Sequence, residues 1–124
     1  GCFLMNGQEL ATAVQYGLNV IVLVVNNGML GTIRMQQEKS YPGRVYGTEL
    51  KNPDFAALAR AYGAFGEHVE RTSDFPEAFA QARKANRPAL LELVVDPEAL
   101  TPNATLSEIH EAGRTRRNRA PDQN

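Results

Sequence analysis

The sequence predicts an α/β fold, a partial three-layer sandwich built around a mostly parallel sheet. Two segments have the composition of strands that parallel sheets bury on both faces: a β-branched run at 19–25 and a largely apolar run at 88–95. Between them lie segments whose apolar residues recur at helical spacing. This alternation of strands and helices favours βαβ crossovers, and therefore parallel strand pairing.

The first element expected is a helix over residues 8–16, in which Leu10 and Val14 share one face. Gly17 suits the position just past the end of that helix, before the strand at 19–25. We expect this apolar face to be covered by other domains of a longer protein. In the chain alone, Leu10 and Val14 are therefore expected to form an exposed apolar patch, together with Met29, Leu30 and Met35 of the segment 29–35.

The middle of the chain is expected to contain a turn at 26–28, a helix at 31–38 and a loop at 39–51. A second helix carries stronger signals, because Asn52 is placed to cap it and Pro53 suits its first turn. Its apolar stripe consists of Phe55, Leu58, Ala59 and Tyr62, and Gly63 ends it.

A short strand at 65–70 is expected to precede a helix that Ser73 or Asp74 caps and that ends near Asn86, before the strand at 88–95. Beyond residue 97 the pattern is weak, with one helical turn expected at 106–110. We therefore predict one domain over residues 1–112 and a flexible tail over 113–124. The arginines of this tail are better explained by a solvated chain terminus than by a nucleic-acid-binding site.

Composition excludes several classes of protein. The 13 lysines and arginines nearly balance the 14 aspartates and glutamates, so no strong field favours nucleic-acid or membrane partners. The longest apolar run, residues 20–25, is too short to span a bilayer. A single cysteine, Cys2, allows no internal disulfide and favours a reducing compartment, and hence a cytoplasmic location.

The chain opens on Gly1-Cys2 without a methionine or a basic leader, so we expect a fragment that begins inside a folded unit. Two loops combine suitable chemistry with the carboxyl ends of predicted parallel strands, where α/β proteins bind ligands. One is Gly1-Cys2 and the other spans residues 26–31. Glycines let a backbone approach phosphate closely, and amide and carbonyl oxygens are ligands that magnesium accepts. An Asn-Asn-Gly turn needs no ligand, however, and the local pattern alone favours a plain turn.

The two loops together resemble the signature of thiamine-diphosphate enzymes, which starts Gly-Asp-Gly and closes with Asn-Asn at the next strand end. Gly1 matches the last glycine of that start, and Asn26-Asn27 falls at the expected distance. The stretch at 29–31 and the strand at 88–97 are most similar to acetolactate-synthase-like enzymes. The resemblance covers about four-fifths of the chain.

The resemblance implies thiamine diphosphate and Mg²⁺ as cofactors. Asn27 would give its side-chain oxygen to magnesium, and Met29 its backbone carbonyl. Asn26 would brace the turn. Backbone groups of four residues would contact the diphosphate: Gly1, Cys2, Leu30 and Gly31.

Two departures from the family pattern matter. The aspartate that supplies a carboxylate to the metal would precede Gly1, and Cys2 stands where the family often has serine. The glutamate that activates the cofactor lies, in the family, on another domain of a partner subunit. No catalytic residue is therefore assigned to this chain.

The full-length parent is expected to be a lyase or transferase that decarboxylates or ligates a 2-oxo acid, and to form a homodimer or homotetramer. Two alternatives stay open. The chain is either an inactive folded fragment that serves as a structural and subunit-interface element, or an unrelated doubly wound nucleotide-binding domain. The lack of a Gly-x-Gly-x-x-Gly motif counts against the second. Arg34, Arg44 and Tyr46 are weaker candidates for contacts with a carboxylate substrate.

Overall fold

A computed structural model describes residues 1–119 of the chain. These residues form two compact units, each described here by itself. The first unit joins Gly1–Asn26 to Lys51–Val95, and the second joins Asn27–Leu50 to the chain from Asp96 onward. Within the described residues, no helix has both the length and the apolar character needed to cross a membrane.

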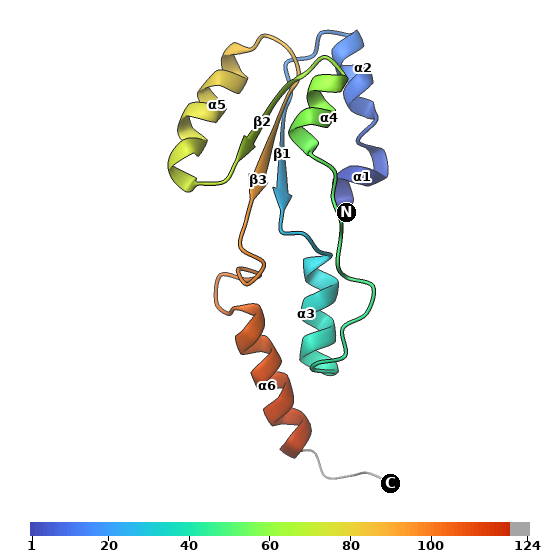
Figure 1. Cartoon of the computed structure of the whole chain (residues 1–124), viewed down its shortest axis with the longest axis vertical. Coiled ribbons are helices and arrows are strands. Elements are labelled where there is room, and N and C mark those ends of the chain that lie inside the picture. The colour runs from blue at the N-terminus through green and yellow to red at the C-terminus, as the bar shows by residue number, and fades with distance from the viewer. Residues whose placement is uncertain (120–124) are drawn as a thin grey trace. The chain divides into compact units, whose positions relative to one another are not determined.

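The first unit is built on a three-stranded parallel sheet (Figure 1). Strand β3 (Ala89–Val94) lies in the middle, between β1 (Ile21–Asn26) and β2 (Phe65–Val69). Leu91 aligns with Leu23 on one side and with Glu67 on the other. The predicted parallel sheet is therefore confirmed.

Helices cover both faces of this sheet, which makes the three layers that the sequence predicted (Figure 1). Helices α2 (Glu9–Gln15) and α4 (Phe55–Ala61) pack on one face, and α5 (Phe75–Lys84) packs on the other. A short helix α1 (Cys2–Asn6) precedes α2, and a 3-10 turn η1 (Thr72–Asp74) leads into α5. The sequence pattern did not predict α1.

Two apolar clusters hold the layers together. On the α4 face, Phe55 is 2% exposed and packs against Leu90, while the ring of Phe3 meets it edge-on at 5.5 Å. On the α5 face, Leu91 lies among small alanines of α5. Each fully buried side chain of this size stabilises the fold by about 1.5–3 kcal/mol.

Two expectations about exposure were wrong. Leu10 is 5% exposed, because it packs into the α4-face cluster of its own unit, and Val14 is partly buried against the same cluster. Strand β1 is not buried on both faces: Leu23 is 45% exposed and Val25 is 64% exposed. In the described structure β1 has a neighbour on one side only, and α5 stands over β2 and β3 instead.

The start of α4 also differs from expectation. Asp54, rather than Asn52, is the N-cap, and its side chain accepts a hydrogen bond from the Ala57 backbone N–H at 2.7 Å. The amide of Asn52 instead donates to the Asn26 side chain at 2.8 Å. The residue expected to cap this helix is therefore tied to the end of β1.

The second unit contains α3 (Gly31–Ser40) and α6 (Leu106–Arg119), which pack side by side (Figure 1). The single turn expected at 106–110 is the beginning of a 14-residue helix. The helix begins with a reciprocal capping box formed by Thr105 and Glu108. This capping signal was overlooked because the apolar pattern in this region is weak. The predicted domain boundary at residue 112 falls inside α6, and residues 120–124 of the predicted flexible tail lie outside the described part.

A buried carboxylate joins α3 to α6. Glu38, 3% exposed, accepts hydrogen bonds from Arg34 at 3.0 Å and from the Gly43 backbone at 2.9 Å, and its Oε2 lies 2.6 Å from His110 Nδ1. Gly113 lets the helices approach, because a Cβ there would strike the Glu38 carbonyl. Burial alone would raise the pKa of Glu38, but the bonds from Gly43, His110 and Arg34 outweigh it and hold the pKa below its ordinary 4.5.

We predict that Glu38→Gln lowers the free energy of unfolding by about 1.5–3 kcal/mol at pH 7, because charge-assisted hydrogen bonds are lost. The folded-state pKa lies below the unfolded value, so the stabilisation is complete above 4.5 and is lost as the pH falls through the folded value. Urea unfolding at several pH values tests both points. Glu111→Gln, at an exposed site 3.5 Å from Arg114, is the control and should have little effect. A difference between wild type and Glu38→Gln that persists unchanged below the folded pKa would contradict the prediction.

Candidate functional site

The six residues predicted to bind a cofactor are divided between the two units. Gly1 and Cys2 belong to the first unit. Gly1 is the N-cap of α1 and accepts a backbone hydrogen bond from Leu4 at 3.1 Å, and Cys2 is an exposed free thiol. The other four predicted residues belong to the second unit: Asn27, Met29, Leu30 and Gly31.

The structure brings the two predicted metal ligands together in a tight turn. Asn27 Oδ1 accepts a hydrogen bond from the Met29 backbone N–H at 3.2 Å, and Gly28 takes a left-handed φ of 69° that suits glycine. The turn is pinned to residues 48–50 by two backbone bonds of 2.8 Å, from Leu30 to the Thr48 carbonyl and from Leu50 to the Gly28 carbonyl. This bridge pairs Met29 with Glu49 but does not use the Met29 carbonyl.

Gly31 allows α3 to begin directly against this turn. A Cβ at position 31 would lie 2.8 Å from Asn27 Nδ2 and 2.9 Å from a methyl carbon of Leu100. Any larger residue would therefore displace the Asn27 amide. Next to Leu30, the hydroxyl of Thr48 is buried and has no hydrogen-bond partner within the described residues.

The donor set of the turn suits a hard cation. An amide oxygen and a backbone carbonyl that the bridge does not use are oxygen ligands of the kind that Mg²⁺ binds, usually together with phosphate oxygens, water and a carboxylate. Across residues 1–119, no three His, Cys, Asp or Glu side chains are grouped so that they could hold a metal. A metal bound at this turn therefore needs further ligands besides Asn27 and Met29.

A second polar cluster, in the first unit, was missed by the sequence pattern. Glu92, in the middle of β3, is 2% exposed. Its Oε1 accepts from Asn26 Nδ2 at 2.7 Å, and its Oε2 accepts from the Phe55 and Ala56 backbone N–H groups at 3.0 and 3.4 Å. An ionisable residue inside an apolar strand was the available signal.

The same carboxylate lies 3.2 Å from Nδ1 of His68, on the neighbouring strand β2. Hydrogen bonding to Glu92, and secondly to Glu70, raises the pKa of His68 above its ordinary value despite partial burial. These contacts of Glu92 are all with nitrogen groups that can donate, as a buried carboxylate requires.

The weaker loop candidates make contacts within the second unit or are exposed. Arg34 is paired with Glu38, and Arg44 lies over the Tyr41 ring at 5.8 Å. Tyr46 is 88% exposed, although its backbone exchanges hydrogen bonds with Gln37.

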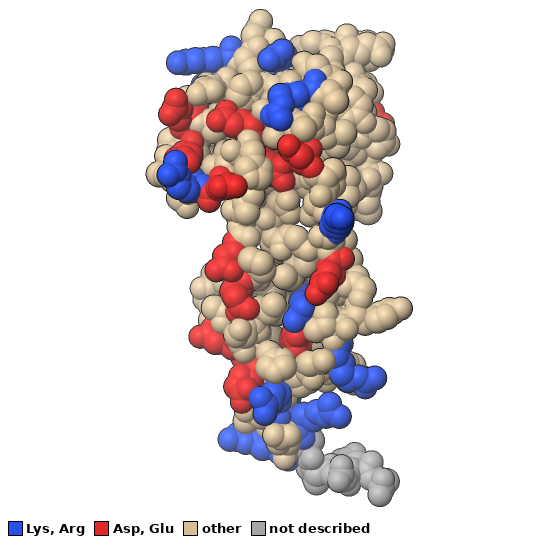
Figure 2. All heavy atoms as spheres, viewed as in Figure 1, with Lys and Arg blue, Asp and Glu red and all other residues tan. Residues whose placement is uncertain are grey.

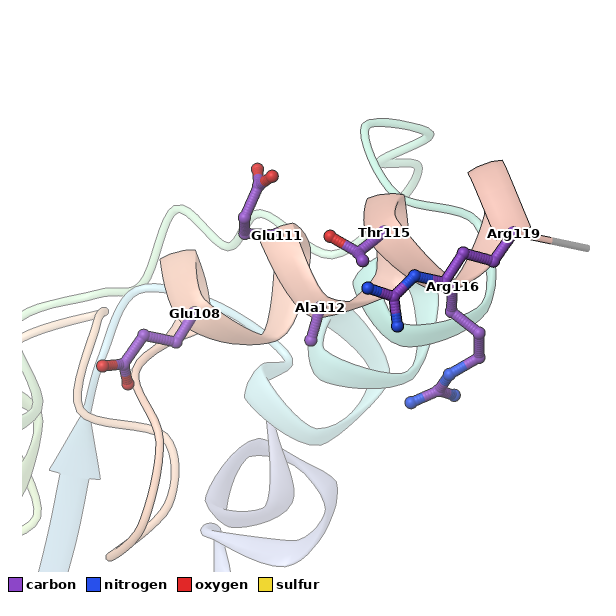
Figure 3. A pocket seen from close by; sticks show the side chains of 6 residues that line it. All are labelled: Glu108, Glu111, Ala112, Thr115, Arg116 and Arg119. Atoms are coloured by element: carbon purple, nitrogen blue, oxygen red, sulfur yellow. The ribbon is translucent and has the colours of Figure 1, made fainter.

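A shallow concavity follows one face of α6 (Figure 3). Carboxylates lie towards the start of the helix, and Lys and Arg side chains gather around its C-terminal end (Figure 2). All of its lining residues come from this single helix, so it does not enclose a ligand. They are Glu108, Glu111, Ala112, Thr115, Arg116 and Arg119.

Comparison with known proteins gives consistent matches. The profile described as "Thiamine pyrophosphate enzyme, C-terminal TPP binding domain" matches residues 1–93. Acetolactate synthase from Mycobacterium bovis is 39% identical over 105 residues, and a probable acetolactate synthase large subunit from Methanocaldococcus jannaschii is 35% identical over 103. These alignments cover 80% and 82% of this chain but 17% of each relative.

A solved structure, benzoylformate decarboxylase from Polynucleobacter necessarius, superposes with a TM-score of 0.73 at 27% sequence identity. The superposition covers 81% of this chain and 19% of that one. The chain thus spans less than a fifth of the length of these relatives.

We predict that Gly31→Ala leaves the fold intact but moves the Asn27 side chain. The crowding atoms are the ends of two side chains that can shift, and alanine favours a helix by about 1 kcal/mol over glycine. Side-chain amide NMR signals test this: the Asn27 signal should move while the melting curve keeps its cooperativity. Thr32→Ala, at the next and exposed position, is the control. An Asn27 signal that is the same in both variants would refute the predicted displacement.

Proposed function

We propose that this chain holds the diphosphate of thiamine diphosphate through a magnesium ion. The chain belongs to the thiamine pyrophosphate enzymes, and it matches their C-terminal TPP-binding domain. The observation that carries this proposal is the turn at 27–31. It joins an amide oxygen, a backbone carbonyl unused by its bridge and a glycine that lets a helix start close by.

We assign the residues as follows. Asn27 gives its side-chain oxygen to Mg²⁺, which requires the oxygen to turn from the Met29 N–H towards the metal. Met29 gives its backbone carbonyl. Leu30 and Gly31 approach the diphosphate with backbone groups at the start of α3, where helical N–H groups favour an anion. Gly1 and Cys2 are assigned further backbone contacts with the diphosphate.

The bound cofactor supplies an electron sink for cleaving or forming the bond next to the carbonyl of a 2-oxo acid. The residues of this chain bind and orient it. The activating group and the carboxylate ligand of the metal are proposed to come from elsewhere in a longer protein. We name no catalytic residue in the described part of this chain.

For that longer protein we propose decarboxylation or ligation of 2-oxo acids, in a cytoplasmic homodimer or homotetramer. The names of the relatives, acetolactate synthase and benzoylformate decarboxylase, support this class of chemistry. The share of the relatives that the chain spans supports a second statement, namely that the chain alone is an inactive structural part.

In the full-length protein, Asn27→Ala is expected to weaken magnesium-dependent cofactor binding by at least about 100-fold. Asn26→Ala should cost about tenfold, as is typical of groups that orient metal ligands without touching the metal. The difference follows because only one side chain of the pair is assigned to the metal. Calorimetry with and without magnesium measures both losses, and equal losses would refute the assignment of Asn27.

The chain by itself is expected to release no carbon dioxide from pyruvate or related 2-oxo acids, even with thiamine diphosphate and magnesium present. The physical reason is that a cofactor site built from part of its walls neither activates the cofactor nor excludes water. A coupled carbon dioxide assay on the purified 124-residue chain tests this. Release that requires both added cofactors would overturn the expectation.

A further inference from the structure

We propose that Glu92 is a positioning residue for the cofactor site, acting through Asn26 on the strand end that carries Asn27. This inference rests on the proposed function, because the site that it positions is the magnesium turn. Glu92 itself contacts neither metal nor cofactor in this assignment.

Besides its contact with His68, Glu92 makes hydrogen bonds that are divided between two tasks. One oxygen, Oε2, accepts from the first backbone N–H groups of α4, at Phe55 and Ala56. The other oxygen, Oε1, accepts from Asn26 Nδ2 at 2.7 Å, the shorter of these bonds. A side chain that served only to start α4 would not need the second oxygen placed on the last residue of β1.

A carboxylate can only accept hydrogen bonds. The carboxylate of Glu92 therefore fixes the orientation of the Asn26 amide, and through it that of the Asn52 amide. Asn26 must turn its nitrogen to Glu92, so its oxygen faces the other way. That oxygen accepts from Asn52 Nδ2 at 2.8 Å, which in turn points the Asn52 oxygen away. Asn52 Oδ1 is buried and has no partner within the described residues, which is the expected end of a relay whose polarity is set at Glu92.

Asn26, the middle residue of this relay, belongs to the backbone that leads into the magnesium turn. Asn26 is the last residue of β1, and its carbonyl accepts from the Val95 N–H at 3.1 Å. Its side chain is fixed by Glu92 and Asn52, so both its backbone and its side chain are held. The next residue is Asn27. A change in the hydrogen bonding of Asn26 is therefore transmitted through one peptide bond to the assigned metal ligand.

A swap of charge between the two positions isolates this effect. In Glu92→Gln, the oxygen of the new side-chain amide still accepts from the Phe55 and Ala56 N–H groups. Its nitrogen, however, then faces the side-chain nitrogen of Asn26. In Asn26→Asp, two carboxylates face one another. In the double variant E92Q/N26D, the amide introduced at position 92 donates to the carboxylate introduced at position 26, which still accepts from Asn52. The net charge and the hydrogen bonds are thereby restored.

The experiment measures binding of thiamine diphosphate with magnesium to the full-length protein by calorimetry, with thermal unfolding in parallel. Each single variant should bind about tenfold more weakly or worse, whereas the double variant should bind within about threefold of wild type. Glu70→Gln is the matched control, because Glu70 is 3.3 Å from His68 but lies outside the relay. Its affinity should equal that of wild type.

The outcomes separate the two proposals. No magnesium-dependent binding by the wild type overturns the proposed function. If the wild type binds, two results overturn the inference about Glu92. One is a Glu92→Gln variant with unchanged affinity, and the other is an equal loss of affinity in Glu92→Gln and Glu70→Gln. If a single variant does not fold, the double variant decides. Recovery of both folding and affinity supports the relay, whereas a double variant that stays unfolded, or that folds without recovering affinity, overturns it.

Discussion

The central position of β3 is the constraint on which the rest of the first unit depends. It alone provides hydrogen bonds to both other strands, and its residues Ala89–Glu92 are all buried. The register of β3 aligns the end of β1 with its own end, since Asn26 pairs with Val94. It also puts Glu92 within hydrogen-bonding distance of both the start of α4 and Asn26. A single strand thus organises the apolar core and the buried polar cluster at once.

Local patterns predicted those elements whose signals are complete within a few residues. The strand at 89–94 and the helix at 75–84 begin and end within about two residues of their predicted bounds, because apolar periodicity and short turns define them. Burial of β1 was predicted wrongly from the same kind of signal. Its composition is that of an interior strand, but composition does not say how many neighbours a strand has.

The partners of several polar side chains were predicted wrongly or missed for a different reason. Asn52 and Asp54 both suit a helix start, and only the position of Asn26 decides that one caps α4 while the other joins the relay. Glu38 and Glu92 are likewise satisfied by groups distant in the chain, among them His110 and Phe55. The turn at 27–31 could be placed from sequence because its residues are contiguous. The carboxylate that supports the preceding residue could not, because Glu92 and Asn26 are 66 residues apart in the sequence.

The strand order also sets a sequence of events in synthesis. Strands β1 and β2 each hydrogen-bond to β3 and not to each other, in the sheet that the structure describes. Within this described sheet, β1 and β2 are joined only after residues 89–94 have been synthesised. Pairing between such distant segments slows folding, because a large loop must close before any contact rewards it. Of the three strands in this sheet β3 is synthesised last, so β1 and α4 meet their buried partners on β3 only at that stage.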